Sequence, residues 1–310
     1  MSIQSEINRI KAAVAALAAS ITNKGVTVPD GTKLDGMAAL VDSIQTGSGG
    51  DATTISDASY FFYQGARVNE FEYLKKYVKK PSKMNNMFAS AAIQNLDLSW
   101  LDTSAVTNMD NAFYALKGTP TLDLRCLDTS NVQSMRYALS YCEAEQILLD
   151  GIDTSKVTNM SYMFNSCKLI TSIDFSGIDT SKVENMTGMF NYCNALTEIL
   201  GFSALAAEGL NIGFPKGDKN GAAYALRRLT FRTDLPDGQY SIMSNINIRY
   251  CSFDRAGIVE MFGTLPDLNG SGVLNGNRNI TITGNPCVKD GTLTDADRSI
   301  ATAKGWTLIE

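Results

Sequence analysis

Four near-copies of one thirteen-residue segment occupy the middle of the 310-residue chain. They read LDTSAVTNMDNAF at 101–113, LDTSNVQSMRYAL at 127–139, IDTSKVTNMSYMF at 152–164 and IDTSKVENMTGMF at 178–190. Their starts are 26, 25 and 26 residues apart, and a weaker copy, SKMNNMF at 82–88, precedes them. Self-similarity at a fixed period of about 20–50 residues is the signature of a protein built from stacked repeats.

Each copy goes with a short run in which apolar and polar residues alternate. The runs are LDLS at 96–99, LDLR at 122–125, ILLD at 147–150 and IDFS at 173–176. Alternation with a period of two predicts a strand with one buried face. In the third copy, Val157, Met160, Met163 and Phe164 are spaced as on one face of a helical turn. The sequence therefore predicts an α/β solenoid in which each repeat supplies a short strand and a short helix or turn.

The Asp-Thr-Ser triplet and a cysteine recur with the repeat. The aspartates are Asp102, Asp128, Asp153 and Asp179, and the cysteines are Cys142, Cys167 and Cys193. A catalytic carboxylate occurs once or twice in a site, whereas a residue present in every repeat is expected to stabilise the structure of the repeat. We therefore expect the aspartates to cap helices or turns and the cysteines to be small buried apolar residues in a structural ladder. The alternative for both ladders is a shared ligand or ion site.

The composition excludes several kinds of chemistry. The chain has no His, which rules out Ser-His-Asp and Cys-His catalysis and every zinc site that needs imidazole. The six cysteines contain no Cys-x-x-Cys pair, and no glycine-rich phosphate-binding motif occurs. We therefore expect no catalytic, cofactor-binding or metal-binding residues, no cofactor and no enzymatic activity. A pair of carboxylates can hydrolyse a polysaccharide without His, but among 32 acidic residues such a pair carries no information.

Charge and hydropathy narrow the range of partners. The net charge is −5, with 27 basic and 32 acidic residues well mixed, and nucleic-acid and anionic-membrane partners need a basic patch. No run of 18 apolar residues occurs, so we expect no membrane span. The first 20 residues lack the basic start and unbroken apolar core of a secretory signal. We expect neither nucleic acid nor membrane as a partner, and no ordinary secretion.

The outward face of the predicted strands is a candidate ligand face. If the apolar residues of each strand point inward, the alternate residues form outward rows. One row holds Asp97, Asp123, Leu148 and Asp174, and the other holds Ser99, Arg125, Asp150 and Ser176. The second row varies between units, which a scaffold position need not do. We expect this face to contact a cell-surface glycan or protein, and the alternative is a solvated face without a partner.

The N-terminal segment predicts two helices. The apolar seam of the first comprises Ile3, Ile7, Ile10, Val14, Leu17 and Ile21, and that of the second comprises Leu34, Met37, Val41 and Ile44. We expect a helical anchor over 1–46, followed by a flexible glycine-containing linker over 47–56. The anchor is either a hairpin that folds on itself or an oligomerising coiled coil, and isoleucine at both seam positions favours a homotrimer.

The rest of the chain, 57–310, predicts one solenoid domain. Residues 57–81 are rich in aromatics and are expected to cap the first turn, 82–200 hold the regular repeats, and 201–310 hold irregular repeats and a C-terminal cap. INIRYCSF and NITITGN predict strands, and DRAGIVEMFGTL and TDADRSIATAKGW predict helices. The last helix carries a capping-box pattern at Thr294 and Asp297 and a stop signal at Gly305.

The repeat pattern D-T-S-x-V-x-x-M-x-x-x-F-x-x-C, followed by L-x-x-I-D-F-S, resembles the BspA-like leucine-rich repeats of bacterial surface proteins. The resemblance is to the subtype with a period of 25–26 residues and covers residues 82–200. The first copy lacks both the triplet and the cysteine, and the second has Leu116 in place of the cysteine. The resemblance implies a leucine-rich-repeat solenoid.

Both ends of the chain carry a second resemblance. Ile7, Ile10 and Lys11, KGV at 24–26, VP at 28–29 and SI at 43–44 are similar to short helical N-termini of structural proteins from phages and prophages of Gram-positive bacteria. The ending ITITGNPC…LTDADRSIATAKGWTLIE resembles the closing units of leucine-rich-repeat proteins in phage virions and gut bacteria.

These resemblances imply a non-enzymatic virion protein, structural or adhesive, in a head fibre, tail fibre or decoration. Such a protein is made in the bacterial cytoplasm, joins other virion proteins through its N-terminal helices and displays the repeats for attachment to a host cell surface. The first alternative is a BspA-like adhesin on the bacterial cell surface that binds host proteins. The second is a tail-associated polysaccharide hydrolase.

Overall fold

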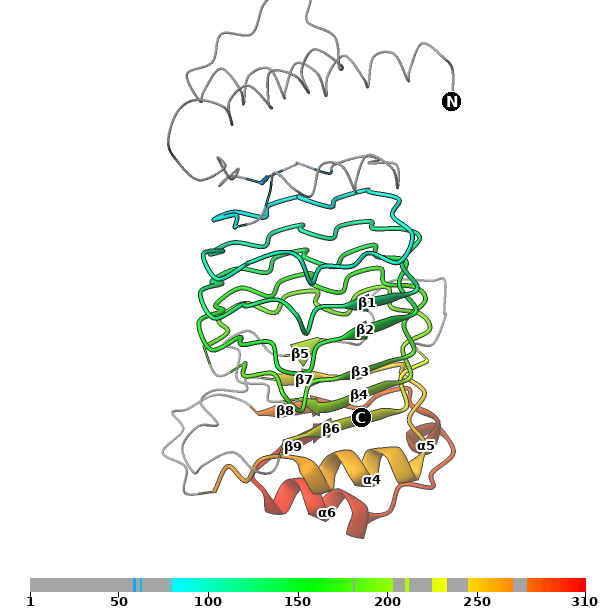
Figure 1. Cartoon of the computed structure of the whole chain (residues 1–310). Helices are drawn as coiled ribbons and strands as arrows, with labels where there is room; N and C mark the ends of the chain where they lie inside the picture. Colours follow the sequence, from blue (N-terminus) through cyan, green and yellow to red (C-terminus); the bar gives the residue numbers. More distant parts are fainter. Residues whose placement is uncertain are drawn as a thin grey trace, which may run out of the picture. The chain divides into compact units, whose positions relative to one another are not determined.

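The computed structural model of the chain divides into two units, Met1–Thr54 and Ile55–Glu310. The structure describes residues 58–59, 62, 78, 80–180, 182–202, 210–211, 225–232, 245–269 and 278–310, with the backbone alone at 210–211 (Figure 1). The expected helical anchor at 1–46 and linker at 47–56 lie outside the described residues, as does most of the aromatic segment at 57–81.

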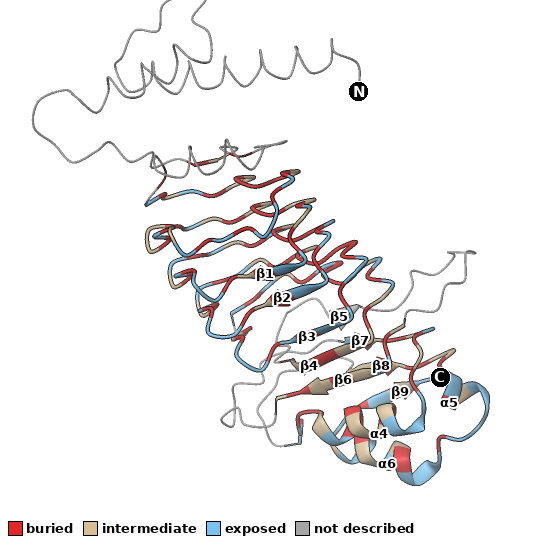
Figure 2. Ribbon diagram, turned by 45° about the vertical axis from the view of Figure 1, so that its right-hand side comes forward, coloured by how far each residue is buried: buried red, intermediate tan, exposed pale blue. Residues whose placement is uncertain are grey.

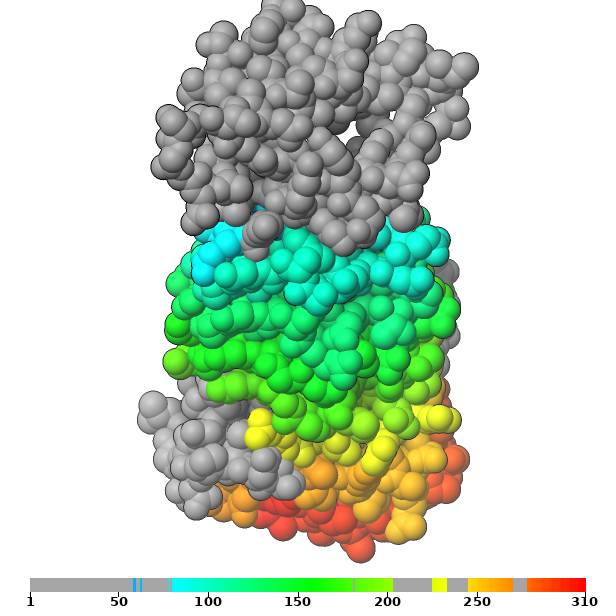
Figure 3. All heavy atoms as spheres, viewed as in Figure 1, coloured from blue at the N-terminus to red at the C-terminus, as the bar shows by residue number. Residues whose placement is uncertain are grey.

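Successive repeats of the second unit lie one after another, and their sequence colours form bands in the space-filling view (Figure 3). Backbone hydrogen bonds join them at the period of the sequence. The N–H groups of Met109 and Asn111 donate to the carbonyl oxygens of Ser134 and Arg136, 25 residues further on, both at 2.9 Å. Isolated parallel bridges continue this alignment through Asn108, Ser134, Asn159 and Asn185.

The described strands are short and pair in parallel. They are β1 (Thr121–Asp123), β2 (Gln146–Leu148), β3 (Ser172–Asp174), β4 (Glu198–Phe202), β5 (Leu210–Asn211), β6 (Arg228–Phe231), β7 (Asn245–Asn247), β8 (Asn279–Thr281) and β9 (Thr307–Ile309). The pairing orders are β1-β2, β3-β4-β6 and β5-β7-β8-β9. Parallel pairing between consecutive repeats places equivalent side chains about 4.8 Å apart.

The strands differ in detail from those predicted. β1, β2 and β3 each begin one residue before the alternating run from which they were expected. The expected strand at 96–99 is not formed, and the N–H of Leu96 donates to the hydroxyl of Thr119 at 3.2 Å instead of to a strand carbonyl. The run INIRYCSF forms a strand only at its start, because a turn follows in which Tyr250 has a φ of 59°.

The segment that was expected to be a short helix or turn is a turn. In the third copy, Tyr162 and Ser166 have φ angles of 56° and 59°, in the left-handed region that an α-helix does not contain. The N–H of Tyr162 donates to the carbonyl of Thr187 in the next repeat, and that of Met163 donates to the carbonyl of Met160. N–H groups thus alternate between the neighbouring repeat and a local turn, which leaves no ladder of helical bonds.

The apolar positions of the repeat fill the core (Figure 2). Equivalent phenylalanines stack on one another: Phe62 on Phe88 at 5.1 Å between ring centroids, Phe88 on Phe113 at 5.5 Å, and Phe164 on Phe190 at 5.7 Å. The rings of each pair are within 8° of parallel, and all five residues are at most 1% exposed. The repeated phenylalanine therefore builds much of the core, and in the second copy the fully buried Leu139 takes its place.

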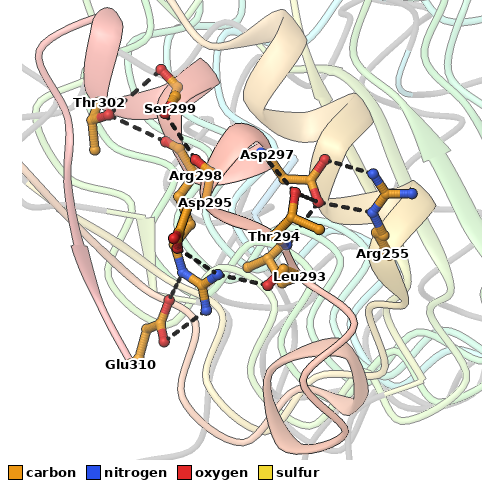
Figure 4. Close-up of polar contacts among 9 residues, drawn as sticks. All are labelled: Arg255, Leu293, Thr294, Asp295, Asp297, Arg298, Ser299, Thr302 and Glu310. Carbon is orange, nitrogen blue, oxygen red and sulfur yellow. Dashed lines mark hydrogen bonds and ion pairs between the residues drawn. The ribbon is translucent and has the colours of Figure 1, made fainter.

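Three described helices lie in the C-terminal part: α4 (Arg255–Thr264), α5 (Pro286–Lys289) and α6 (Asp295–Ala303). α4 packs on β6 and α6. The predicted capping box at the start of α6 is confirmed, with Thr294 and Asp297 bonded reciprocally, and Gly305 follows the helix with a φ of 84°. Asp297 also accepts two hydrogen bonds from Arg255 of α4, at 2.8 and 2.9 Å, so one carboxylate ties the two helices together (Figure 4).

Candidate binding surfaces

The repeated aspartates sit in local turns. Oδ1 of Asp102 accepts the N–H of Ser104 at 3.0 Å and its hydroxyl at 2.6 Å. The bond to the Ser104 hydroxyl, with help from Lys80, lowers the pKa of Asp102 to about 2. Asp128 and Asp153 accept the corresponding N–H groups of Ser130 and Ser155, and Asp179 lies at the same position of the fourth copy. The carboxylates of Asp102, Asp128 and Asp153 are therefore occupied by the backbone of their own repeat.

The threonine of the triplet joins one repeat to the next. The hydroxyl of Thr103 donates to the carbonyl of Asp128 at 2.9 Å, and that of Thr129 donates to the carbonyl of Asp153 at 2.8 Å. Thr154 bonds to the carbonyl of Asp179 in the same way, at 2.7 Å. Because each threonine is buried, the hydroxyl satisfies a carbonyl that has little access to water.

The structure places the three repeated cysteines inside the core as free thiols. The thiol of Cys167 lies 3.0 Å from the carbonyl oxygen of Leu139, and that of Cys193 lies 2.9 Å from that of Phe164. Burial raises the pKa of Cys142 to about 11 and that of Cys193 to about 12. Thiols with such pKa values are neutral and unreactive at pH 7.

Of the residues expected on the strand face, Asp123, Leu148 and Asp174 are the last residues of β1, β2 and β3, whereas Asp97 and Ser99 lie where no strand is formed. The structure aligns Asp123 with Leu148 and Asp174 with Leu200. The carboxylates of Asp97, Asp123 and Asp174 each accept an N–H from the residue two positions on, which is Ser99, Arg125 and Ser176 respectively. They therefore repeat the local turn made by the triplet aspartates.

Two charged residues on this face, Asp123 and Arg125, form an ion pair with each other. Nε and Nη2 of Arg125 donate to the two carboxylate oxygens of Asp123 at 2.9 and 2.8 Å, and the hydrogen bonds from Arg125 lower the pKa of Asp123. Asp150 is exposed near Arg125. The structure thus brings Asp123, Arg125 and Asp150 together, and the first two engage each other.

A second surface, which the sequence did not lead us to expect, lies on the turns with left-handed residues. Four successive repeats line an open hollow of about 650 Å³ there. Its walls are Asn111, Tyr114, Tyr137, Tyr141, Tyr162, Asn165, Asn191 and Tyr192. All of these side chains are tyrosines or asparagines, so the lining presents aromatic rings, hydroxyls and carboxamides without a formal charge. We call it the tyrosine hollow.

Two columns of equivalent positions supply five of the eight residues that line the tyrosine hollow. The first column runs Asn111, Tyr137, Tyr162 and Gly188, and the second runs Ala115, Tyr141, Ser166 and Tyr192. All eight residues have φ between 51° and 63°. The backbone therefore repeats from unit to unit while the side chain changes.

The first column ends at Gly188, which lies against the aromatic ring of Tyr162. Tyr137 and Tyr162 stack at 4.8 Å between centroids, with their planes 5° apart, and the guanidinium of Arg136 lies 4.9 Å from the centre of the Tyr137 ring. A Cβ atom on Gly188 would lie 2.3 Å from Cε1 of Tyr162. The glycine therefore leaves the space that the ring occupies.

The second column contains a gap. The small side chain of Ser166 separates Tyr141 from Tyr192, so the two tyrosines are two repeat spacings apart, about 10 Å. Tyr141 is 46% exposed and Tyr192 is 50% exposed. The hollow thus has a small residue between two exposed rings.

Among the described residues, no three His, Cys, Asp or Glu side chains gather as metal ligands. In that part of the chain, none of the helices has the length and apolar character needed to cross a membrane.

The structure is that of a protein built from stacked repeats. Buried residues such as the repeated threonines hold the repeats together, and the exposed tyrosines vary between repeats. Comparison with known families agrees with the repeat. The family model described as "Mycoplasma protein of unknown function, DUF285" matches twice, at residues 42–147 and 114–205. The two matches overlap and together span just over half of the chain, so the chain belongs to this family. No curated protein matches it.

Proposed function

We propose that this chain is a non-enzymatic attachment protein: a leucine-rich-repeat solenoid that is displayed on a phage virion and binds a host cell surface. The observation that carries the attachment role is the tyrosine hollow. Its lining changes between repeats whose Asp-Thr-Ser bonds stay the same and whose core positions stay apolar. Scaffold needs account for the constant residues and not for the exposed tyrosines. The virion location rests on the resemblance of both chain ends to phage structural proteins.

The N-terminal helices would join other virion proteins and, as a homotrimer, would present several copies of the domain together. Multivalent display raises overall binding strength without new contacts. The strand face remains a second candidate contact surface. Asp123→Asn combined with Asp174→Asn tests it, because asparagine keeps the oxygen that accepts the turn N–H and removes the charge.

The second candidate is a bacterial surface adhesin that binds host proteins. The description of the matched family as a Mycoplasma protein favours it, because that description names a cellular organism and not a virus. In this second candidate the chain still attaches to a host, but it is displayed on a bacterial cell and not on a phage particle.

The location is tested by immunogold labelling of purified phage particles and of intact bacteria with an antibody raised against the full chain. Label on a head or tail structure is expected. Label confined to the bacterial surface would replace the first candidate with the second. The attachment role is tested separately by adding the fluorescently labelled full chain to candidate host cells, and absence of binding to any of them would contradict both candidates.

A further inference from the structure

We propose that the tyrosine hollow is a binding site for a neutral carbohydrate, a step that rests on the attachment function proposed above. The hollow is lined by tyrosine and asparagine side chains alone. Sugars present flat C–H faces and many hydroxyls, and these need aromatic faces and uncharged hydrogen-bonding groups. None of the lining residues carries a charge, and Arg136, which lies beside the hollow, is stacked on the ring of Tyr137.

The exposed rings supply the stacking surfaces. Tyr141 and Tyr192 leave about half of their surface in water, although aromatic side chains bring large apolar area to an interface at low entropic cost. The face of an aromatic ring carries negative charge density and attracts the slightly positive C–H groups of a sugar ring. Tyr141 and Tyr192 belong to the same column two repeats apart, so both can stack on sugar rings of one extended chain.

The asparagines supply the polar contacts. Within the described residues, the side-chain amides of Asn111 and Asn191 make no hydrogen bond, so their donors and acceptors are available to a ligand. The amide nitrogen of Asn165 donates to the hydroxyl of Ser140 at 3.0 Å, which fixes the orientation of that carboxamide on the wall. Fixed polar groups beside apolar faces are the usual way in which ligand sites set orientation.

The shape suits an extended chain of sugars. Residues from four successive repeats line the hollow, which at about 4.8 Å per repeat gives a length of about 14 Å. A protein partner would be expected to bury a larger patch with an apolar centre. We therefore infer that the occupant is an oligosaccharide segment of a cell-surface glycan.

The left-handed turns also provide side chains for a clean test. Ala115 and Ser166 occupy the same column position as Tyr141 and Tyr192, with φ angles of 51° and 59°. Tyr141→Ala and Tyr192→Ser therefore introduce residues that the chain already tolerates in this geometry. Conversely, Ser166→Tyr adds a bulky ring between the two tyrosines at a position that is only 6% exposed, and it tests whether the spacing of the two exposed rings matters.

A matched control lies outside the hollow. Tyr250 has the same left-handed backbone, with a φ of 59°, is 39% exposed, and has Arg249 over its ring at 4.8 Å. It also faces a glycine, because a Cβ on Gly284 would lie 2.3 Å from its ring. Tyr250→Ala removes the same kind of exposed ring from the same kind of turn.

The experiment measures binding of the full chain to immobilised hexasaccharides of neutral hexoses, of N-acetylhexosamines and of uronic acids. The wild-type chain should bind at least one neutral set. Tyr141→Ala with Tyr192→Ser, and separately Ser166→Tyr, should weaken that binding tenfold or more, as expected for a buried aromatic contact. Tyr250→Ala should leave it unchanged, and equal melting temperatures should show that all four proteins fold.

Three results would overturn the proposal: no binding to any neutral set, binding to uronic acids alone, or equal binding by wild type and hollow variants. Treatment of host cells distinguishes failure of the carbohydrate site from failure of the proposed attachment function. If attachment of the chain to cells survives periodate oxidation of their sugars and is lost after protease treatment, the partner is a protein. The attachment function then stands and the carbohydrate site does not.

Discussion

The buried threonine of the triplet gives the sharpest test of how the repeats hold together. Thr129 is 3% exposed, and its hydroxyl donates to the carbonyl oxygen of Asp153 in the next repeat at 2.8 Å. Thr129→Val keeps the size and branching of the side chain and removes only the hydroxyl. The change therefore isolates one bond between repeats.

The expected cost follows from the group left behind. Deleting one partner of a buried hydrogen bond leaves the other unsatisfied, which costs about 1–3 kcal/mol. Valine recovers part of this because it adds an apolar methyl to a buried place, so we expect about 2 kcal/mol. For a unit of this size, about 2–4 °C in melting temperature corresponds to each kcal/mol, which predicts a fall of about 4–8 °C.

The assay compares thermal unfolding of the full chain, followed by circular dichroism, with that of Thr107→Val. Thr107 belongs to the same repeat pattern and is exposed, and a surface substitution of this kind changes stability by no more than about 0.5 kcal/mol. If Thr129→Val and Thr107→Val melted at the same temperature, the hydroxyl would not join the repeats in the way described.

Four further outcomes are expected. Alkylation of the native chain, counted by mass spectrometry, should modify Cys126 alone among the six cysteines because the other five are buried, and fast labelling of a second would contradict this. Cys167→Ser should lower the free energy of unfolding by about 1–3 kcal/mol, since the shorter serine gives up apolar contacts and its more polar hydroxyl lies further than the thiol from the carbonyl oxygen of Leu139, and an unchanged melting temperature would disprove it. Gly188→Ala should destabilise the fold by about 1 kcal/mol or more, because its φ is +63° and the new methyl would meet the ring of Tyr162; thermal unfolding with no loss of stability would refute the contact. The hydrogen bonds of Asp297 with Arg255 and Thr294 lower its pKa, so the unfolded chain binds the proton first. The melting temperature should therefore drop as the pH falls below about 4, and Asp297→Asn should show less of that drop if the assignment is right.

The inward positions of the repeat were predictable from the sequence. Val157 and Met160 recur at fixed offsets in all four thirteen-residue copies, Leu139 replaces the equivalent of Phe164 in the second copy, and all four of these residues are at most 1% exposed. Recurrence identifies them because a stack buries the same position in each unit, whatever local structure the unit adopts. The capping box of α6 was predictable for a different reason: Thr294 and Asp297 satisfy each other within one turn of the chain.

The local structure between those positions was less predictable. The spacing of Val157, Met160, Met163 and Phe164 suits one face of a helical turn, yet the left-handed angles at Tyr162 and Ser166 rule out an α-helix. Bonds to the neighbouring repeat compete with helical bonds, and a single copy of the pattern contains no sign of that competition. Tyrosine is also not a residue from which a left-handed conformation is normally predicted.

The tyrosine hollow was missed because its residues do not follow the repeat. Patterns that recur drew attention to Asp, Thr, Ser and Cys, whereas Tyr141 and Tyr192 replace Ala115 and Ser166 at one position. The sequence did contain a signal, because the residue at this position varies between repeats as the residues of the second strand row do. The bonds of the constant residues show that they hold the repeats together, which leaves the variable positions of each turn as candidate ligand contacts.

The separation between constant and variable positions has a physical basis in where the bonds between repeats are made. Tyr137, Tyr141 and Tyr162 donate their backbone N–H groups to the next repeat at 2.8–3.0 Å, as do Asn111 and Ala115 at 2.8–2.9 Å. The bond is the same for a tyrosine, an asparagine or an alanine, because it uses only the main chain. A side chain at these positions can therefore change without loss of a bond between repeats. The stack fixes the spacing of the turns, and each turn can present a different group to a ligand at that spacing.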